Sequence, residues 1–128
     1  PEGALNCGRP FAEPAVLLRR TDLLITDISS IMLDFLLLGR PVLGYFPDRR
    51  EYHNRERGLL HDLDAVFPGE LAEEFDNFAS ALERILHKGE SSQGRQRRLA
   101  ALNMFHDHKD AESSKRVVSF VRNLLGLE

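Results

Sequence analysis

Two short apolar runs, each closed by polar or turn-forming residues, stand out in the first half of the chain. Residues 23–25 form one run, which ends at Thr26, and residues 41–46 form the other, which stops at Pro47. Brief apolar runs without alternation are typical of strands that are buried on both faces of a parallel sheet. The pattern therefore predicts two neighbouring strands in the interior of the protein.

The segment between these runs predicts a buried helix. Residues 31–38 contain one polar side chain, Asp34, so a helix here is apolar nearly all round and must lie deep in the protein. Ser29 or Ser30 would begin it as an N-cap, and Gly39 would end it. A buried Asp34 carboxylate needs a donor partner, and we expect it to hold the neighbouring loop. Strand, helix and strand in so short a stretch predict a right-handed βαβ unit with parallel strands.

Further helices are predicted around this unit. They are expected over residues 15–20 behind Pro14, from Asp76 to near Gly89, over residues 91–105 and over residues 113–125. Residues 48–70 are rich in charged and turn-forming residues and predict a surface loop, while residues 71–75 suit either a short strand or a helical turn. The fold class is therefore α/β, in a single domain.

Composition narrows the range of partners. The 128 residues and 42% hydrophobic content fit one packed core, and the formal net charge of -3 gives no positive field that would attract nucleic acid. The single cysteine, Cys7, excludes an internal disulfide, and without a charged and apolar leader the chain is expected to be cytoplasmic. The apolar runs are too short to cross a bilayer, and the histidines lack the spacing of metal ligands. Neither a transmembrane segment, nor a metal, nor a cofactor is expected.

The first candidate site follows the first predicted strand. Ligands of parallel α/β sheets bind beyond the carboxyl ends of the strands, and Thr26, Asp27, Ser29 and Ser30 stand at that edge. Free amide groups, the positive end of a helix dipole and two hydroxyls would together form an anion site suited to a diphosphate. The alternative is that Ser29 and Ser30 only cap the helix.

The second candidate site is the start of the last predicted helix. Ser113 or Ser114 would cap this helix, while Lys115 and Arg116 in its first turn oppose the helix dipole. A bound phosphate would make these cations favourable, because Arg offers a planar fork of donors. The alternative is a solvated helix start in which nearby carboxylates such as Asp110 offset the cations.

Two further groups of polar residues are weaker candidates. The loop with Asp48, Glu51, Tyr52, Arg57 and Gly58 follows the second predicted strand, and so lies at the same edge as the first site, although a solvated charged loop would have the same composition. His106 and His108 flank Asp107. For these histidines an exposed loop at a helix end is favoured over acid–base catalysis.

The order of these motifs resembles a known family. Residues 22–30 (DLLITDISS), followed by Asp34 and residues 39–41 (GRP), are similar to the pattern DxLITDYSS…D…GRP of the CDP-glycerol:poly(glycerophosphate) glycerophosphotransferases. Later segments resemble that family's D…EY…RG…PG succession and its DGxxSxR element, at residues 48–52, 57–58, 68–69 and 110–116. The resemblance covers residues 16 to about 122. Departures are Ile28 in place of tyrosine, Leu59 and Leu60 in place of aromatics, and Ala111 in place of glycine.

The resemblance implies a Rossmann-like parallel sheet flanked by helices, similar to the second half of the C-terminal lobe of a glycosyltransferase B-type fold. It implies an enzyme that transfers glycerol phosphate from CDP-glycerol to a polyol-phosphate or lipid-linked acceptor and releases CMP. The implied diphosphate ligands are Thr26, Ser29, Ser30, Ser113, Ser114 and Arg116. The implied residues at the border of the pocket are Asp27, Asp48, Arg57 and Gly58.

The resemblance also sets expectations about the rest of the enzyme. The family's catalytic histidines belong to earlier segments, so the catalytic residues are unknown and the acceptor-binding lobe is expected outside this sequence. We therefore expect no turnover by this chain alone. Apolar surface left by an absent half favours a homodimer in isolation. A location at the inner face of the cell membrane, as a peripheral protein, is compatible with the expected acceptors.

Two other functions fit parts of the sequence. A sugar-nucleotide glycosyltransferase or UDP-GlcNAc 2-epimerase-like enzyme would also present a helix start to a diphosphate, but it would carry a ribose-binding glutamate near the position of Asp34. A non-catalytic interaction module would bind no nucleotide and would expose an apolar face. Selectivity for cytidine over uridine nucleotides separates the first alternative from the glycerophosphotransferase.

Overall fold

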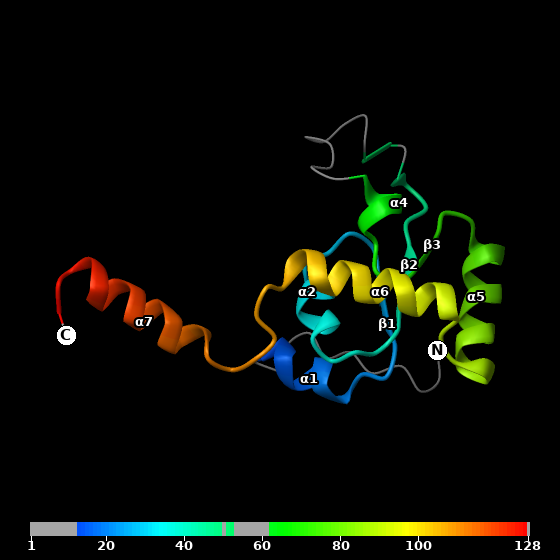
Figure 1. The fold of residues 1–128 in the computed structure, drawn as a ribbon. Coiled ribbons are helices and arrows are strands. Elements are labelled where there is room, and N and C mark those ends of the chain that lie inside the picture. The colour runs from blue at the N-terminus through cyan, green and yellow to red at the C-terminus, as the bar shows by residue number, and fades with distance from the viewer. Residues whose placement is uncertain (1–12, 50, 53–61, 128) are drawn as a thin grey trace.

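The computed structural model describes residues 13–49, 51–52 and 62–127 (Figure 1). The helices among them are α1 (Pro14–Arg20), α2 (Ile31–Leu36), α4 (Leu63–Val66), α5 (Phe75–Lys88), α6 (Ser92–Phe105) and α7 (Ser113–Leu124). The strands are β1 (Leu24–Thr26), β2 (Val42–Tyr45) and β3 (Glu70–Ala72). The mixed α/β fold predicted from the sequence is confirmed.

The strands form one parallel sheet in the order β1-β2-β3. Leu43 of β2 pairs with Ile25 of β1 on one side and with Glu70 of β3 on the other, so β2 is the central strand. The predicted parallel pairing of the first two strands is confirmed, and the undecided segment at residues 71–75 contributes the end of β3. Since all three strands run the same way, their carboxyl ends lie at one edge of the sheet.

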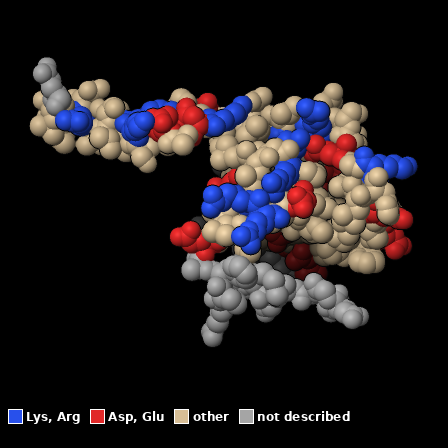
Figure 2. Space-filling model, turned by 90° about the horizontal axis from the view of Figure 1, so that it is seen from below, with Lys and Arg blue, Asp and Glu red and all other residues tan. Residues whose placement is uncertain are grey.

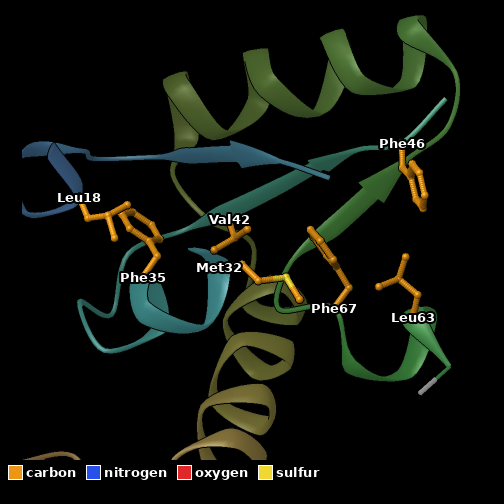
Figure 3. Packing of buried hydrophobic residues seen from close by; sticks show 7 residues of the cluster. All are labelled: Leu18, Met32, Phe35, Val42, Phe46, Leu63 and Phe67. Carbon is orange, nitrogen blue, oxygen red and sulfur yellow. The ribbon is translucent and has the colours of Figure 1, made fainter. Parts of the chain in front are cut away.

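One face of the sheet packs on a cluster of seven buried side chains that come from α1, α2, β2, α4 and the loops beside them (Figure 3). Its members are Leu18, Met32, Phe35, Val42, Phe46, Leu63 and Phe67. The opposite face is covered by α5, where Leu43 packs against Ala81 and Ile85 (Figure 3). Successive residues of β2, such as Val42 and Leu43, therefore face opposite sides of the sheet.

The expectation that β1 is buried on both faces is wrong. Ile25 is 47% exposed, because α5 packs over β2 and β3 and leaves β1 at the open edge of the sheet. The buried helix is also shorter and more exposed than predicted. It ends at Leu36, Leu37 is exposed, and Asp34 lies on the exposed side, so its carboxylate is not buried. Gly39 follows the end of this helix with a φ of 66°, as its predicted role requires.

The prediction of a surface loop over residues 48–70 is wrong for its last part. Leu63 and Phe67 are buried in the first cluster, and Pro68 is among the most deeply buried side chains. The carboxylate of Asp62 caps α4 by accepting a hydrogen bond from the backbone N–H of Asp64 at 3.1 Å. Charged neighbours hid this short helix, because its apolar residues are too few to show a periodic pattern.

Two helix starts also differ from the prediction. The N-cap of α5 is Glu74, two residues before Asp76, and the N-cap of α7 is Glu112, so neither Ser113 nor Ser114 takes that position. The helix predicted over residues 91–105 is confirmed as α6, and Ser91 is its N-cap: the Ser91 hydroxyl accepts a hydrogen bond from the backbone N–H of Gly94 at 3.0 Å. The starts of the helices that were predicted from the sequence lie within two residues of those observed, whereas α4 was not predicted.

A buried ion pair anchors α6. The Arg98 guanidinium donates to the Glu90 carboxylate from Nε at 3.0 Å and from Nη2 at 2.9 Å, and the side chains are 8% and 15% exposed. A Cβ atom at Gly39 would lie 3.7 Å from Arg98 Nη1, so this guanidinium also sits beside the turn that follows α2. The pair therefore ties the α5–α6 turn to α6, next to the α2–β2 turn.

We predict that Arg98→Met lowers the free energy of unfolding by about 3 kcal/mol, because it leaves the Glu90 carboxylate largely buried without its partner. The matched control is Arg84→Met, whose pair with Glu70 is more exposed, at 39% and 32%, and whose loss should cost less than about 1 kcal/mol. Urea denaturation followed by circular dichroism measures both. Equal losses in the two variants would show that the Arg98–Glu90 pair has no special structural role.

Candidate functional site

The segment that joins β1 to α2 leaves its polar groups available. Asp27 Oδ1 accepts a hydrogen bond from the backbone N–H of Ser29 at 2.9 Å, and this bond shapes the turn. Ser30 is the N-cap of α2, but its side chain makes no capping hydrogen bond. The alternative in which the two hydroxyls serve as helix caps is therefore not what the structure shows. Both serines are exposed, beside Thr26 at the end of β1.

Backbone donors lie next to these hydroxyls. The amides of Met32 and Leu33 bond to the carbonyls of Ser29 and Ser30, at 3.2 and 2.9 Å, and so close the first turn of α2. Within the part of the chain that the structure describes, no hydrogen bond involves the amides of Ser30 and Ile31. Because α2 has only six residues, we expect its dipole to add less than these local donors do. The geometry is that of a donor-rich turn open to solvent.

The start of α7 is organised around an exposed ion pair. Arg116 donates from Nη2 to Asp110 Oδ1 at 2.8 Å and from Nη1 to Oδ2 at 3.2 Å, and Nη2 also reaches the Ser113 hydroxyl at 3.2 Å. The Arg116 hydrogen bonds and the backbone N–H of Glu112 lower the pKa of Asp110 from 3.8 to about 2. Lys115 pairs with Glu112 at 2.6 Å. Carboxylates thus offset both cations, as the solvated alternative for this helix start anticipated.

The two halves of the predicted diphosphate site lie apart. In Figures 1 and 2, α7 extends away from the body of the molecule as an arm, and none of its residues is buried. Within the residues that the structure describes, no hydrogen bond or ion pair joins residues 110–116 to residues 26–30. The structure therefore shows two separate groups of candidate phosphate ligands.

The loop after β2 is held by its own contacts. The Tyr52 ring packs edge-on against Phe46, with ring centroids 5.6 Å apart, and the Tyr52 N–H donates to the Asp48 carbonyl at 2.9 Å. Asp48 and Glu51 face a pocket of about 590 Å³ that Pro47, Glu73 and Glu74 also line. Arg57 and Gly58, which were predicted at the border of the donor pocket, lie outside the described residues.

Sequence reasoning missed two residues that organise this edge. Arg49 donates to Asp64 at 2.7 Å and to Glu73 at 3.2 Å, and so joins the loop after β2 to α4 and to the loop after β3. The hydrogen bonds with Asp64 are the main cause of the raised pKa of Arg49 and of the lowered pKa of Asp64. Glu73 was not predicted either, because the strand that places it was undecided. Its position directly after residues 71–72, a possible strand, is the sequence feature that could have indicated it.

His106 connects α6 to α2. Its Nε2 lies 2.9 Å from the Leu33 carbonyl, and it must carry the proton to donate to that oxygen. The interpretation of an exposed loop holds for His108, whereas His106 is half-buried and has a structural partner. The described residues bring no three His, Cys, Asp or Glu side chains together as metal ligands, and none of their helices has the length and apolar character needed to cross a membrane.

Comparison with known proteins extends the sequence resemblance. The model of the CDP-glycerol:poly(glycerophosphate) glycerophosphotransferase family matches residues 11–123, which is most of the chain. The chain belongs to this family. The structure shows where the motif residues lie: the DLLITDISS segment supplies β1 and the open turn, and the GRP segment begins at Gly39, in the turn between α2 and β2.

The relatives synthesise teichoic acids, according to their names. The chain is 33% identical over 98 residues to the teichoic acid poly(glycerol phosphate) polymerase of Bacillus spizizenii, which covers 77% of this chain and 24% of the polymerase. It is 29% identical over 116 residues to the teichoic acid ribitol-phosphate polymerase TarL of Staphylococcus aureus, covering 91% of this chain and 19% of TarL. The chain thus spans about a quarter or less of the length of these relatives.

We predict that Arg116→Ala raises the pKa of Asp110 from about 2 toward its ordinary value of 3.8, because the largest cause of the lowered pKa is removed. A folded-state pKa below the unfolded one gives a stabilising contribution that is present above the unfolded pKa and is lost as the pH falls through about 2. NMR titration of the Asp110 carboxyl carbon measures the shift.

The control for this titration is Lys115→Ala, which removes a neighbouring cation that pairs with Glu112 and not with Asp110. The pKa of Asp110 should stay at about 2 in that variant. An equal rise in both variants would show that general charge, and not the Arg116 hydrogen bonds, sets the titration of this carboxyl.

Proposed function

We propose that this chain forms part of the donor site of an enzyme that transfers glycerol phosphate from CDP-glycerol to a polyol-phosphate or lipid-linked acceptor, with release of CMP. The observation that carries the proposal is the turn after β1, where the hydroxyls of Ser29 and Ser30 take no part in helix capping. The family membership of the chain supplies the reaction class.

The turn after β1 has the chemistry to bind a diphosphate. Thr26, Ser29 and Ser30 offer hydroxyl donors, and the neighbouring amides of Ser30 and Ile31 offer backbone donors at the same place. Hydrogen bonds to a charged acceptor are roughly twice as strong as neutral ones, so a few such donors hold an anion effectively. In the transfer, the acceptor oxygen bonds to the phosphorus that carries glycerol, and the bond from that phosphorus to the bridging oxygen breaks. These donors stabilise the charge that grows on the departing CMP.

The start of α7 provides the second half of the donor site. Arg116 already presents its fork to a carboxylate, and a phosphate accepts the same two parallel bonds. A diphosphate therefore competes with Asp110 for Arg116, with Ser113 and Ser114 beside it at the helix start. This role requires α7 to approach the turn after β1 when a diphosphate binds.

The pocket that Asp48, Glu51, Glu73 and Glu74 line determines on which side of the site the donor phosphates bind. Asp48, Glu51, Glu73 and Glu74 carry like charges that repel a diphosphate, so the phosphates sit on the β1 side and away from this pocket. Asp27 lies next to the serines and Asp48 borders the donor, while the same role for Arg57 and Gly58, which lie outside the described residues, rests on the family resemblance. Carboxylates placed there accept hydrogen bonds from hydroxyls of the donor and not from its phosphates.

Turnover needs more groups at the phosphate than the described residues bring together there. Phosphoryl transfer depends on positioning and charge stabilisation from all sides of the reacting group, and the two groups of ligands here lie apart. We therefore expect binding without transfer by this chain. The acceptor and the catalytic residues belong to the other part of a two-lobed, glycosyltransferase B-type enzyme.

We predict that the chain binds CDP-glycerol and CMP in calorimetry and binds UDP-N-acetylglucosamine more weakly. Ser30→Ala should weaken binding about fivefold, as expected for one hydrogen bond, and Arg116→Ala should weaken it at least about tenfold, because it removes charge-assisted bonds. The matched controls are Ser80→Ala on α5 and Arg95→Ala on α6, both at exposed positions, which should bind as the parent does.

Three outcomes would contradict parts of this proposal. Preference for the uridine nucleotide would favour the sugar-nucleotide enzyme. Equal losses in the controls would remove the site assignment. A non-catalytic module would be favoured if calorimetry detects no binding heat with any nucleotide. The same result should then persist after the chain is fused to a relative's upstream sequence.

A further inference from the structure

His106 joins two helices that are far apart in the sequence. It is the C-cap residue of α6, where its backbone N–H donates to the Leu102 carbonyl at 3.0 Å. Its Nε2 lies 2.9 Å from the carbonyl oxygen of Leu33, the third residue of α2. The two helices pack against each other (Figure 1). The His106 side chain therefore links the end of α6 to the start of α2.

The Leu33 carbonyl is open to this bond because α2 changes its hydrogen-bond pattern at its end. In a regular α-helix the N–H of Leu37 would donate to the carbonyl four residues back, which is that of Leu33. Here it donates to the Asp34 carbonyl at 3.3 Å instead. The His106 ring thus supplies a donor to a carbonyl that its regular helix partner does not reach.

A second hydrogen bond continues from Leu33 to the turn after β1. The Leu33 N–H donates to the Ser30 carbonyl at 2.9 Å. This carbonyl and the N–H of Ile31 belong to one planar peptide unit, so a bond that fixes the direction of the carbonyl also fixes that of the amide. In a trans unit the two groups point in opposite directions. The Ile31 N–H therefore points out of α2, and within the described residues it has no hydrogen-bond partner.

We infer that His106 is a positioning residue of the donor site, which holds the peptide between Ser30 and Ile31 in the orientation that a phosphate requires. The inference rests on the proposed function, because it assigns a ligand to that amide. Isolated helices shorter than about 12 residues are marginal in water, and α2 has six. In contrast, α6 has 14 residues and is anchored by the Arg98–Glu90 pair. The longer helix thus holds the shorter one, and an amide that is already oriented loses less conformational entropy when an anion binds.

The first test is calorimetric titration of the full 128-residue chain with CDP-glycerol. His106→Ala should weaken binding about fivefold, as expected for the loss of one hydrogen bond. His106→Gln should restore most of the affinity, because its side-chain amide can donate to the Leu33 carbonyl. The matched control is His108→Ala, which removes an exposed histidine from the same segment and should bind as the parent does.

Combined substitutions separate positioning from a general loss of structure. His106→Ala together with Ser30→Ala should weaken binding by less than the product of the single effects, because both act on the same turn. His106→Ala together with Arg116→Ala should give the full product, since α7 lies apart from that turn. Coupling to Arg116 and independence of Ser30 would overturn the inference, because His106 would then act through the start of α7.

A measurement without nucleotide separates this inference from the proposed function. In amide NMR spectra of the free chain, His106→Ala should shift the Ser30 and Ile31 resonances, and His106→Gln should leave them close to their parent positions. If these shifts occur but the parent binds no nucleotide, the proposed function fails while the orienting role of His106 is supported. Unchanged Ile31 resonances, parent-like affinity of His106→Ala, or equal losses for His106→Ala and His108→Ala would each overturn the inference.

Discussion

The burial of β2 on both faces is the constraint on which the rest of the structure depends. Val42 packs into one cluster and Leu43 into the other, and both neighbouring strands pair with β2 in parallel. Close approach makes this possible, since a Cβ at Gly69 would lie 1.9 Å from the Val42 carbonyl oxygen. The Pro68-Gly69 motif of the family thus lets β3 reach β2. In turn, the parallel pairing places the turns after all three strands at one edge.

Local chemistry made much of this fold predictable. The runs of β1 and β2, the turn at Gly39 and the cap at Ser91 depend on neighbouring residues, so the sequence alone indicates them. Burial was less predictable because it depends on what packs from elsewhere. The apolar residues around Asp34 suggested a helix enclosed on all sides, but Asp34 is exposed and none of the described elements covers it. Leu63 and Phe67 show the opposite case. They lie in a charged stretch of sequence, but residues from distant segments bury them.

In the candidate site, too, the local features were predictable and the contacts between distant segments were not. The sequence predicted hydroxyls at a strand end and a cationic helix start, and the structure places Ser29, Ser30 and Arg116 in those local settings. The sequence left open whether Asp110 or a phosphate occupies the guanidinium fork of Arg116, because carboxylate and phosphate compete for the same donors. Nor could it reveal that Arg49 links three loops through Asp64 and Glu73, since that arrangement depends on contacts between distant segments.

The start of α7 places competing demands on one guanidinium. Arg116 stands in the first turn of this helix, where its planar fork binds Asp110 and its Nη2 also reaches the Ser113 hydroxyl. A donor phosphate would need the same two parallel bonds, so Asp110 must release the fork when a diphosphate binds. Because Asp110 is exposed, water can solvate its released carboxylate, and the exchange costs little. The exposed ion pair therefore keeps Arg116 oriented without preventing it from binding an anion.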